Sequence, residues 1–190
     1  FNESAKYICS GVDLFIAPSE FIKNKFVENG IPQEKIIYSP YGFDKLNFLH
    51  HQRKNINMNI LRFGYMGTLL PMKGLGVLIA AFKRLKYKNI KLSICGKLFP
   101  YSGFESYPKL LKRMVRNDSR IELMGGYDNK DVADILVNID VLIVPSIWLE
   151  NAPLVTQEAF LSGTPVIASR IGGIPELVTD GVNGLLFNPG

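Results

Sequence analysis

Cysteine, histidine and long apolar runs are scarce in this sequence. Cys9 and Cys95 are far apart and belong to no C-x-x-C pair or Cys/His ligand spacing, so we expect free thiols and no metal site. The adjacent His50 and His51 point apart on either a helix or a strand, which disfavours a shared metal ion. No apolar run reaches the roughly 18 to 20 residues that span a bilayer, and the first ten residues lack the pattern of a signal peptide. These absences favour a globular, cytoplasmic protein.

Acidic residues are fewer than basic ones, with 17 Asp and Glu against 22 Lys and Arg, so the net charge is +5. A basic balance favours anionic ligands such as phosphates or anionic lipid. No block of five like charges occurs and aromatic residues are not interleaved with basic ones, which makes nucleic acid the weakest partner. The charge leaves room for contact with the inner membrane surface, although no basic amphipathic helix is clear from the sequence.

The 190 residues, 47% of them apolar, suffice for one sizeable α/β domain with part of a neighbour. Short apolar runs alternate with stretches of helical periodicity, which is typical of parallel βαβ units. We therefore predict a Rossmann-like, doubly wound parallel sheet. The stretch 141–146 is almost uniformly apolar and should lie at its centre. The expected strands are 59–67, 91–96, 121–125, 141–146, 165–169 and 184–187, and the expected helices include 109–117, 130–137 and 153–161.

The helix expected after the first of these strands has a regular apolar stripe. Its members recur at i, i+3, i+4, i+7 and i+10, so they should share one side and face the sheet. They are Leu75, Leu78, Ile79, Phe82 and Leu85.

The chain divides into three parts. Residues 1–43, with strands expected at 13–19 and 35–42 and a helix at 20–28, resemble the end of a preceding domain, and the polar stretch 44–57 is interpreted as a linker. Residues 58–190 form the predicted ligand-binding domain. The sequence begins without Met and stops directly after an expected strand, so we expect both ends to be cut.

The loop and helix after strand 141–146 have a ligand-binding pattern. Ligands of parallel sheets bind beyond the carboxyl ends of the strands, where a helix start offers free amides and a positive dipole end. Here the helix is expected to start at Pro153, and its amides are those of Ala152, Leu154 and Val155. Glu150 precedes this start and Glu158 follows it by about one turn. From the residues alone, both glutamates are equally consistent with exposed acids.

Two glutamates separated by seven residues are followed by SGTPVIASRIGGIPELV and then DGVNGLLFNPG. This combination resembles the signature of retaining glycosyltransferases of family 4, which have the GT-B fold. The resemblance implies that Glu150 is catalytic and lies by the transferred sugar, and that Glu158 binds the ribose hydroxyls of the nucleotide. It also implies that Asn151, Ala152, Pro153 and Leu154 support the sugar and diphosphate, and that the domain is the donor half of the fold.

A second motif, GYMGTLLPMKG at 64–74, is similar to the family's first strand, glycine turn and lysine. The resemblance assigns Gly67 and Thr68 to the donor site and makes Lys73 a catalytic cation for the diphosphate. Thr68 replaces the family's arginine, so the charge must come from elsewhere, and Lys97 after Gly96 is the candidate.

The resemblance also implies that the loops after the second and third strands form walls for the base. Gly96 and Met124 represent these two loops among the predicted donor-binding residues.

The resemblance implies a nucleoside-diphosphate sugar as donor, with no other cofactor and no metal, because no D-x-D motif occurs. The acceptor, a glycan or a lipid-linked molecule, would bind the upstream domain, so the isolated chain should be almost inactive. One alternative is a non-catalytic nucleotide-sugar-binding or assembly subunit. Another is a dinucleotide-dependent oxidoreductase, which the G-x-x-G turn after the first strand disfavours, since that class needs G-x-G-x-x-G.

Overall fold

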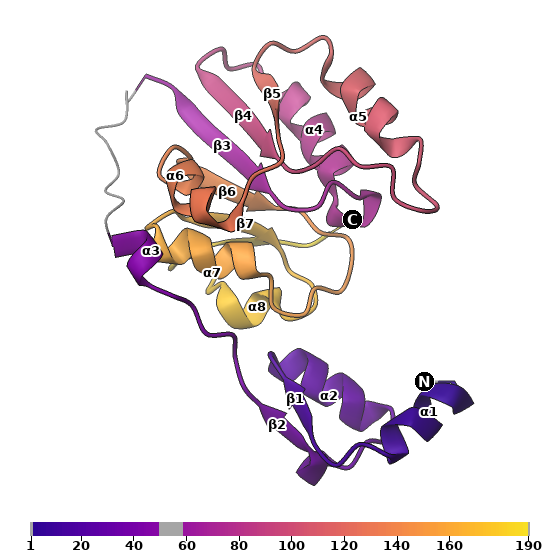
Figure 1. Cartoon of the computed structure of the whole chain (residues 1–190). Coiled ribbons are helices and arrows are strands. Elements are labelled where there is room, and N and C mark those ends of the chain that lie inside the picture. The colour runs from indigo at the N-terminus through magenta and orange to yellow at the C-terminus, as the bar shows by residue number, and fades with distance from the viewer. Residues whose placement is uncertain (1, 50–58, 190) are drawn as a thin grey trace.

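The computed structural model describes residues 2–49 and 59–189, and a six-stranded parallel sheet forms its larger part (Figure 1). The strand order is β5-β4-β3-β6-β7-β8, and each neighbouring pair is parallel. The predicted α/β class with a Rossmann-like sheet is confirmed. The strands are β3 (Leu61–Met66), β4 (Ile90–Cys95), β5 (Ile121–Gly125), β6 (Val141–Val144), β7 (Val166–Ser169) and β8 (Gly184–Phe187).

Helices cover both faces of this sheet, and each face has its own cluster of buried side chains. Ile79 of α4 and Leu111 of α5 belong to the cluster on one face. Leu136 of α6 and Ile174 of α8 belong to the cluster on the other. The sheet is therefore doubly wound. The helices are α4 (Leu75–Arg84), α5 (Tyr107–Val115), α6 (Val132–Leu136), α7 (Leu154–Leu161) and α8 (Ile174–Leu177), with 3-10 turns η2 (Pro71–Lys73) and η3 (Asn129–Asp131) before α4 and α6.

The direction in which strands are added reverses between β3 and β6. The chain first adds β4 and β5 on one side of β3 and then returns to add β6, β7 and β8 on the other. At such a reversal the loops leave in opposite directions and open a crevice beyond the carboxyl ends of the strands. β6 pairs with both β3 and β7, which confirms its predicted central place. A ligand site is expected just beyond Met66 and Val144.

The apolar stripe predicted on α4 holds at four of its five positions. The buried members are Leu75, Leu78, Ile79 and Phe82. The prediction for Leu85 is wrong, because α4 ends at Arg84 and Leu85 continues in extended backbone with its side chain 38% exposed.

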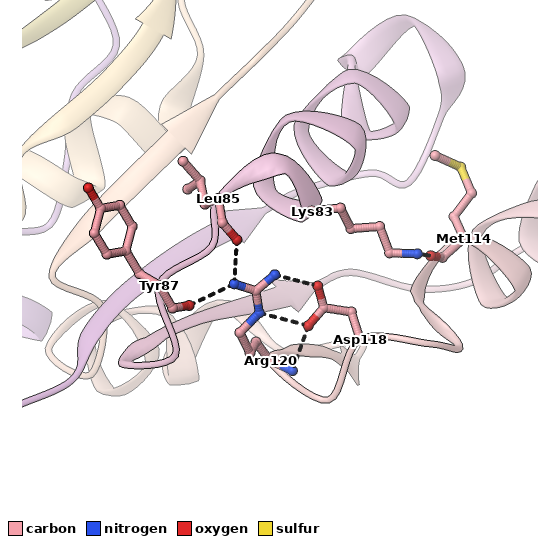
Figure 2. A network of polar contacts seen from close by, with 6 residues as sticks. All are labelled: Lys83, Leu85, Tyr87, Met114, Asp118 and Arg120. Carbon is pink, nitrogen blue, oxygen red and sulfur yellow. Dashed lines mark hydrogen bonds and ion pairs between the residues drawn. The ribbon is translucent and has the colours of Figure 1, made fainter.

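Arg120, just before β5, fixes the end of α4 against the rest of this layer (Figure 2). Its guanidinium donates to the carbonyl oxygens of Leu85 and Tyr87, both at 2.7 Å, and to both carboxylate oxygens of Asp118. These bonds lower the pKa of the Asp118 carboxyl, mainly through the hydrogen bond from the guanidinium. The Leu85 carbonyl, at the C-cap of α4, is one of those that a helix end leaves without a partner, and the Tyr87 carbonyl follows in the connection to β4, so this turn is held without a capping glycine.

The first residues form a smaller unit with its own buried cluster of Ala17, Ile31 and Ile36. Its two strands are parallel, and α2 has the predicted bounds. The second strand ends at Tyr38 rather than at Gly42, since Pro40 cannot donate a ladder hydrogen bond. The elements are α1 (Glu3–Ser10), β1 (Phe15–Ala17), α2 (Glu20–Glu28), the 3-10 turn η1 (Gln33–Lys35) and β2 (Ile36–Tyr38).

The predicted linker 44–57 contains a short helix, α3 (Leu46–Leu49), where a continuous irregular stretch was expected. Its residues 50–57, with His50 and His51, lie outside the described residues.

Candidate functional site

A cavity of about 350 Å³ lies at the reversal between β3 and β6. The loop after β3, the loop after β6, the turn before α6 and the start of α7 all contribute to its wall. Lys73 and Glu158, which are 85 positions apart in the sequence, therefore border the same space. The lining residues are Tyr65, Met66, Gly67, Thr68, Lys73, Tyr127, Asn129, Val132, Ile143, Val144, Ser146, Glu150, Pro153, Leu154, Val155 and Glu158.

Glu150 is buried and fully paired at one end of the cavity. Only 7% of the residue is exposed, and the Lys73 ammonium contacts its two carboxylate oxygens at 2.7 and 3.0 Å. The Ser146 hydroxyl donates a further hydrogen bond to the carboxylate. The interpretation of Glu150 as an exposed loop acid is thereby excluded. An ionised carboxylate can remain in such a place because a cation and a hydroxyl replace its water.

The turn before α4 brings Lys73 to Glu150. Gly74, the next residue, has φ +72°, and a Cβ there would lie 1.7 Å from the carbonyl oxygen of Pro145. Only glycine permits both that backbone angle and that contact. The Ile147 amide also donates to the carbonyl oxygen of Met72 at 3.0 Å. The loops after β3 and β6 are therefore in backbone contact, which places the lysine beside the glutamate.

Gly172 and Gly173 hold the Glu150 loop from its other side. The Gly173 amide donates to the carbonyl oxygen of Glu150 at 2.7 Å. A Cβ on Gly172 would lie 2.2 Å from that same oxygen, and one on Gly173 would lie 1.8 Å from the carbonyl oxygen of Asn151. The glycine pair thus allows a close backbone approach to the loop of Glu150.

Glu158 is half-buried on α7 and faces the cavity without a partner of opposite charge among the described residues. Loss of hydration raises the pKa of this carboxyl. Burial also raises the pKa of the neighbouring Tyr127 to about 12, and the Glu158 charge contributes to that shift. The carboxylate is an acceptor available for ligand hydroxyls.

The start of α7 differs slightly from the prediction. Leu154 is the first helical residue, and Pro153 is the extended residue before it, with no side-chain cap. The first amides of a helix have no acceptor within it, and Leu154 and Val155 line the cavity. They are placed to donate to an anion.

Tyr65 and Ser146 are site residues that the sequence analysis missed. The Tyr65 hydroxyl donates to the Thr68 carbonyl oxygen at 2.7 Å and so fixes the glycine turn, and burial strongly raises the pKa of this phenol. Their signal was position, because Tyr65 lies near the end of β3, two residues before the predicted Gly67, and Ser146 follows β6 by two residues, four before the predicted Glu150.

Several predicted residues lie outside the cavity. The Asn151 side chain points to the first unit, where its oxygen accepts from the Ser19 hydroxyl at 2.7 Å, and Ala152 is buried. Gly96 and Lys97 border an adjoining hollow of about 270 Å³ that shares Gly67, Thr68, Tyr127 and Asn129 with the cavity. Met124 is 54% exposed and borders a different hollow.

Within residues 2–49 and 59–189, no group of three or more His, Cys, Asp and Glu side chains is arranged to hold a metal ion. Over the same ranges, no helix has the length and apolarity to cross a bilayer.

A family model described as "Glycosyl transferases group 1" matches residues 48–190. The chain is 34% identical to an uncharacterized glycosyltransferase of Methanocaldococcus jannaschii, over 95% of this chain and 47% of that protein. It is 32% identical to the lipopolysaccharide 1,2-N-acetylglucosaminetransferase of Salmonella typhimurium, over 89% of this chain and 47% of that protein. This chain thus spans about half the length of these curated relatives.

This chain also matches about half the length of solved structures with a similar fold. Anabaena HepE, in complex with UDP-glucose, has a TM-score of 0.81 at 26% identity, over 94% of this chain and 50% of that one. A glycosyltransferase from Rickettsia africae has a TM-score of 0.82 at 20% identity, over 100% of this chain and 54% of that one, and this is a likeness of fold.

Proposed function

Because the chain belongs to the group 1 family of glycosyl transferases, we propose that it is the donor-binding part of a retaining enzyme that uses a nucleoside-diphosphate sugar. One observation carries this proposal: the paired Lys73 and Glu150 and the unpaired Glu158 line one cavity at the sheet reversal. The complex of a solved relative with UDP-glucose supports a uridine nucleotide.

The proposed donor lies along the cavity with its ribose near Glu158. Vicinal hydroxyls donate hydrogen bonds to that carboxylate, whose ionised form accepts them best. The amides of Leu154 and Val155 bind the diphosphate, because a helix start favours an anion. The sugar then lies toward Glu150, at the end where the carboxylate is already paired.

Lys73 and Glu150 are the proposed catalytic groups. When the bond between the sugar and the diphosphate breaks, its electron pair leaves with the diphosphate, and the acceptor hydroxyl oxygen bonds to the same carbon while its proton passes to the departing diphosphate. The Lys73 ammonium borders the cavity and stabilises the negative charge that develops there. Its ion pair with Glu150 fixes the ammonium before the donor binds, so little reorganisation accompanies the reaction.

Thr68 lines the cavity and brings no charge to it. Lys97 borders the adjoining hollow together with Thr68, so it is the proposed second cation for the diphosphate. Without such a cation, the alternative of a non-catalytic sugar-nucleotide-binding subunit is favoured, since leaving-group stabilisation would rest on Lys73 and the helix amides alone.

The remaining parts of the proposal concern the whole protein. Residues 1–43 end an acceptor domain, 44–57 connect it to the donor domain 58–190, and the acceptor is a glycan or lipid-linked molecule. Transfer needs no metal, and the 190-residue chain alone turns over little or nothing. Joining the upstream acceptor domain should produce transfer, and binding without transfer by the joined protein would favour the non-catalytic alternative.

Thermal-shift measurements on the 190-residue chain test donor binding. UDP-sugars should raise the Tm, with smaller shifts for GDP- and ADP-sugars and none for NAD. Glu158→Ala should remove the shift, whereas Glu122→Ala, which changes an exposed carboxylate on β5, should retain it. Stabilisation by NAD alone, or an unchanged shift in Glu158→Ala, would exclude the proposed donor site.

A further inference from the structure

The outer side of α5 carries a stripe of positive charge. Its members recur at i, i+3, i+4 and i+7, so they project from one side of the helix, and all are exposed. The opposite side is buried through Tyr107 and Leu111. We name this group the basic stripe: Lys109, Lys112, Arg113 and Arg116.

The surrounding sequence concentrates this charge. Residues 83–116 contain ten Lys and Arg and a single acidic residue, Glu105, whereas the whole chain has a net charge of only +5. The rest of the chain is therefore net negative. Among the described residues, no carboxylate pairs with the basic stripe, and nearby Asp118 is bound by Arg120.

The end of α4 adds to the same region. The Lys83 ammonium donates to the carbonyl oxygen of Met114 in the last turn of α5, and Arg120 fixes the backbone at Leu85 and Tyr87 (Figure 2). These contacts hold the exposed segment with Arg84, Lys86 and Lys88 next to the end of α5. The cations thus lie on α5, on the last residue of α4 and on the connection that follows α4.

We propose that the basic stripe docks on an anionic lipid bilayer. The four cations are spread over about 10 Å of helix, given a rise of 1.5 Å per residue, and they project outward. Cations arranged in this way can contact many phosphates in one plane. A site for a single phosphate would instead have donors that converge on one point. Ser106 and the exposed Leu110 border a shallow hollow of about 690 Å³ with the stripe, and Leu110 adds an apolar contact. The stripe itself has no aromatic ring on which nucleic acid bases could stack, and the adjacent segment 84–88 adds only one, the exposed Tyr87.

Basic residues on an amphipathic helix are attracted to anionic lipid, and each one near the surface strengthens binding about fivefold. The sequence alone did not make such a helix clear, because Leu110 and Met114 interrupt the charge pattern. Burial of Tyr107 and Leu111 distinguishes the two sides. The docking surface is separate from the cavity, so it does not depend on the proposed donor chemistry.

Co-sedimentation of the 190-residue chain with vesicles tests this surface. Vesicles of phosphatidylcholine with 30% phosphatidylglycerol should bind the chain at low salt, those of phosphatidylcholine alone should not, and 0.5 M NaCl should release it. Neutralising the stripe with Lys109→Gln, Lys112→Gln, Arg113→Gln and Arg116→Gln should weaken binding at least about tenfold. Glutamine keeps helix propensity, and circular dichroism should show an unchanged fold. If this variant unfolds, the pair Lys109→Gln and Lys112→Gln should still weaken binding about fivefold or more.

The matched control removes four positive charges elsewhere, with Gln at Lys6, Lys25, Lys45 and Lys130, and should bind within about twofold of the parent. Equal loss in both variants would show a net-charge effect and overturn the proposal. So would absence of binding to anionic vesicles, or release by millimolar inorganic phosphate at constant ionic strength, which would indicate a site for free phosphate. Stripe-dependent binding of single-stranded RNA without vesicle binding would also overturn it.

Discussion

The two glutamates of the cavity are held in different ways. Glu150 lies on a loop, and distant parts of the chain supply its partners: Lys73 before α4, Ser146 after β6 and Gly173 before α8. Glu158 is placed by its own helix and has no cation partner among the described residues. The end of the cavity proposed for the sugar is therefore assembled by tertiary structure, whereas the end proposed for the ribose needs little more than a helix in the right place.

The first unit extends this difference. The Ser19 hydroxyl donates to Asn151, next to Glu150, and also caps α2 by accepting from the Ile22 amide. The amides of Glu20 and Phe21 donate to the Glu176 carboxylate of α8 at 2.8 and 2.6 Å. Figure 1 shows this unit next to α8. Remote changes should consequently disturb the Glu150 loop more than Glu158.

The largest effect is expected from Lys73→Met, which leaves Glu150 buried with only Ser146 as partner. Removing one member of a buried pair costs about 3 to 5 kcal/mol of unfolding free energy. Because Lys73 is partly exposed, we expect a smaller cost of about 2 to 3 kcal/mol. Urea denaturation measures it. Lys6→Met, which breaks an exposed pair with Glu3, should cost less than about 1 kcal/mol. Equal costs would show that Glu150 is not anchored by its cation.

Gly173→Ala should destabilise the chain by about 2 kcal/mol, because its Cβ would overlap the carbonyl of Asn151. Gly11→Ala is a matched control, since both glycines have φ −83° and the nearest atom to a Cβ at Gly11 is 3.7 Å away. That control should change stability by less than about 1 kcal/mol. Calorimetry should show that Gly173→Ala lowers the affinity for UDP-glucose, relative to the parent, more than it lowers the affinity for UDP. A variant as stable as the control would contradict the close packing.

Ser19→Ala should remove two hydrogen bonds of a residue that is 2% exposed, at a cost of about 1 to 2 kcal/mol. Asn151 then loses its partner, so the affinity for UDP-glucose should fall about threefold while the affinity for UDP stays constant. A threefold loss corresponds to a hydrogen bond that contributes under about 1 kcal/mol. Ser10→Ala, at an exposed helix end, serves as control. Equal losses for both ligands would show that the first unit does not position the sugar end.

The smallest effect concerns Glu158. Burial raises its folded pKa, so its ionisation opposes folding as pH rises through that value, and the protein is relatively more stable below the ordinary glutamate pKa. Glu158→Gln should therefore match the parent Tm near pH 4 and exceed it at pH 7 by on the order of 1 °C. Scanning calorimetry at both values measures this, with Glu122→Gln as control for the lost charge. A Tm below that of the parent at pH 7 would show that the carboxylate has a stabilising partner.

The sequence predicted the β-α alternation because apolar periodicity is local, and the strands of the large sheet were found within two residues of their predicted ends. Local pattern failed where a helix end or a proline decided the structure, as at Leu85 and Pro40. For the site, the motif identified Glu150, Glu158 and Lys73, all of which line the cavity. It did not reveal Tyr65 or Ser146, since their roles depend on contacts with neighbouring loops.

The sequence by itself determined which elements form, which sides of them are apolar and which residue types stand after the strands, because these depend on near neighbours in the chain. Tertiary structure decided the burial and pairing of each glutamate, the direction of the Asn151 side chain and the exposure of one charged side of α5. Burial, pairing and close backbone approach join residues distant in sequence, and no local pattern carries that information.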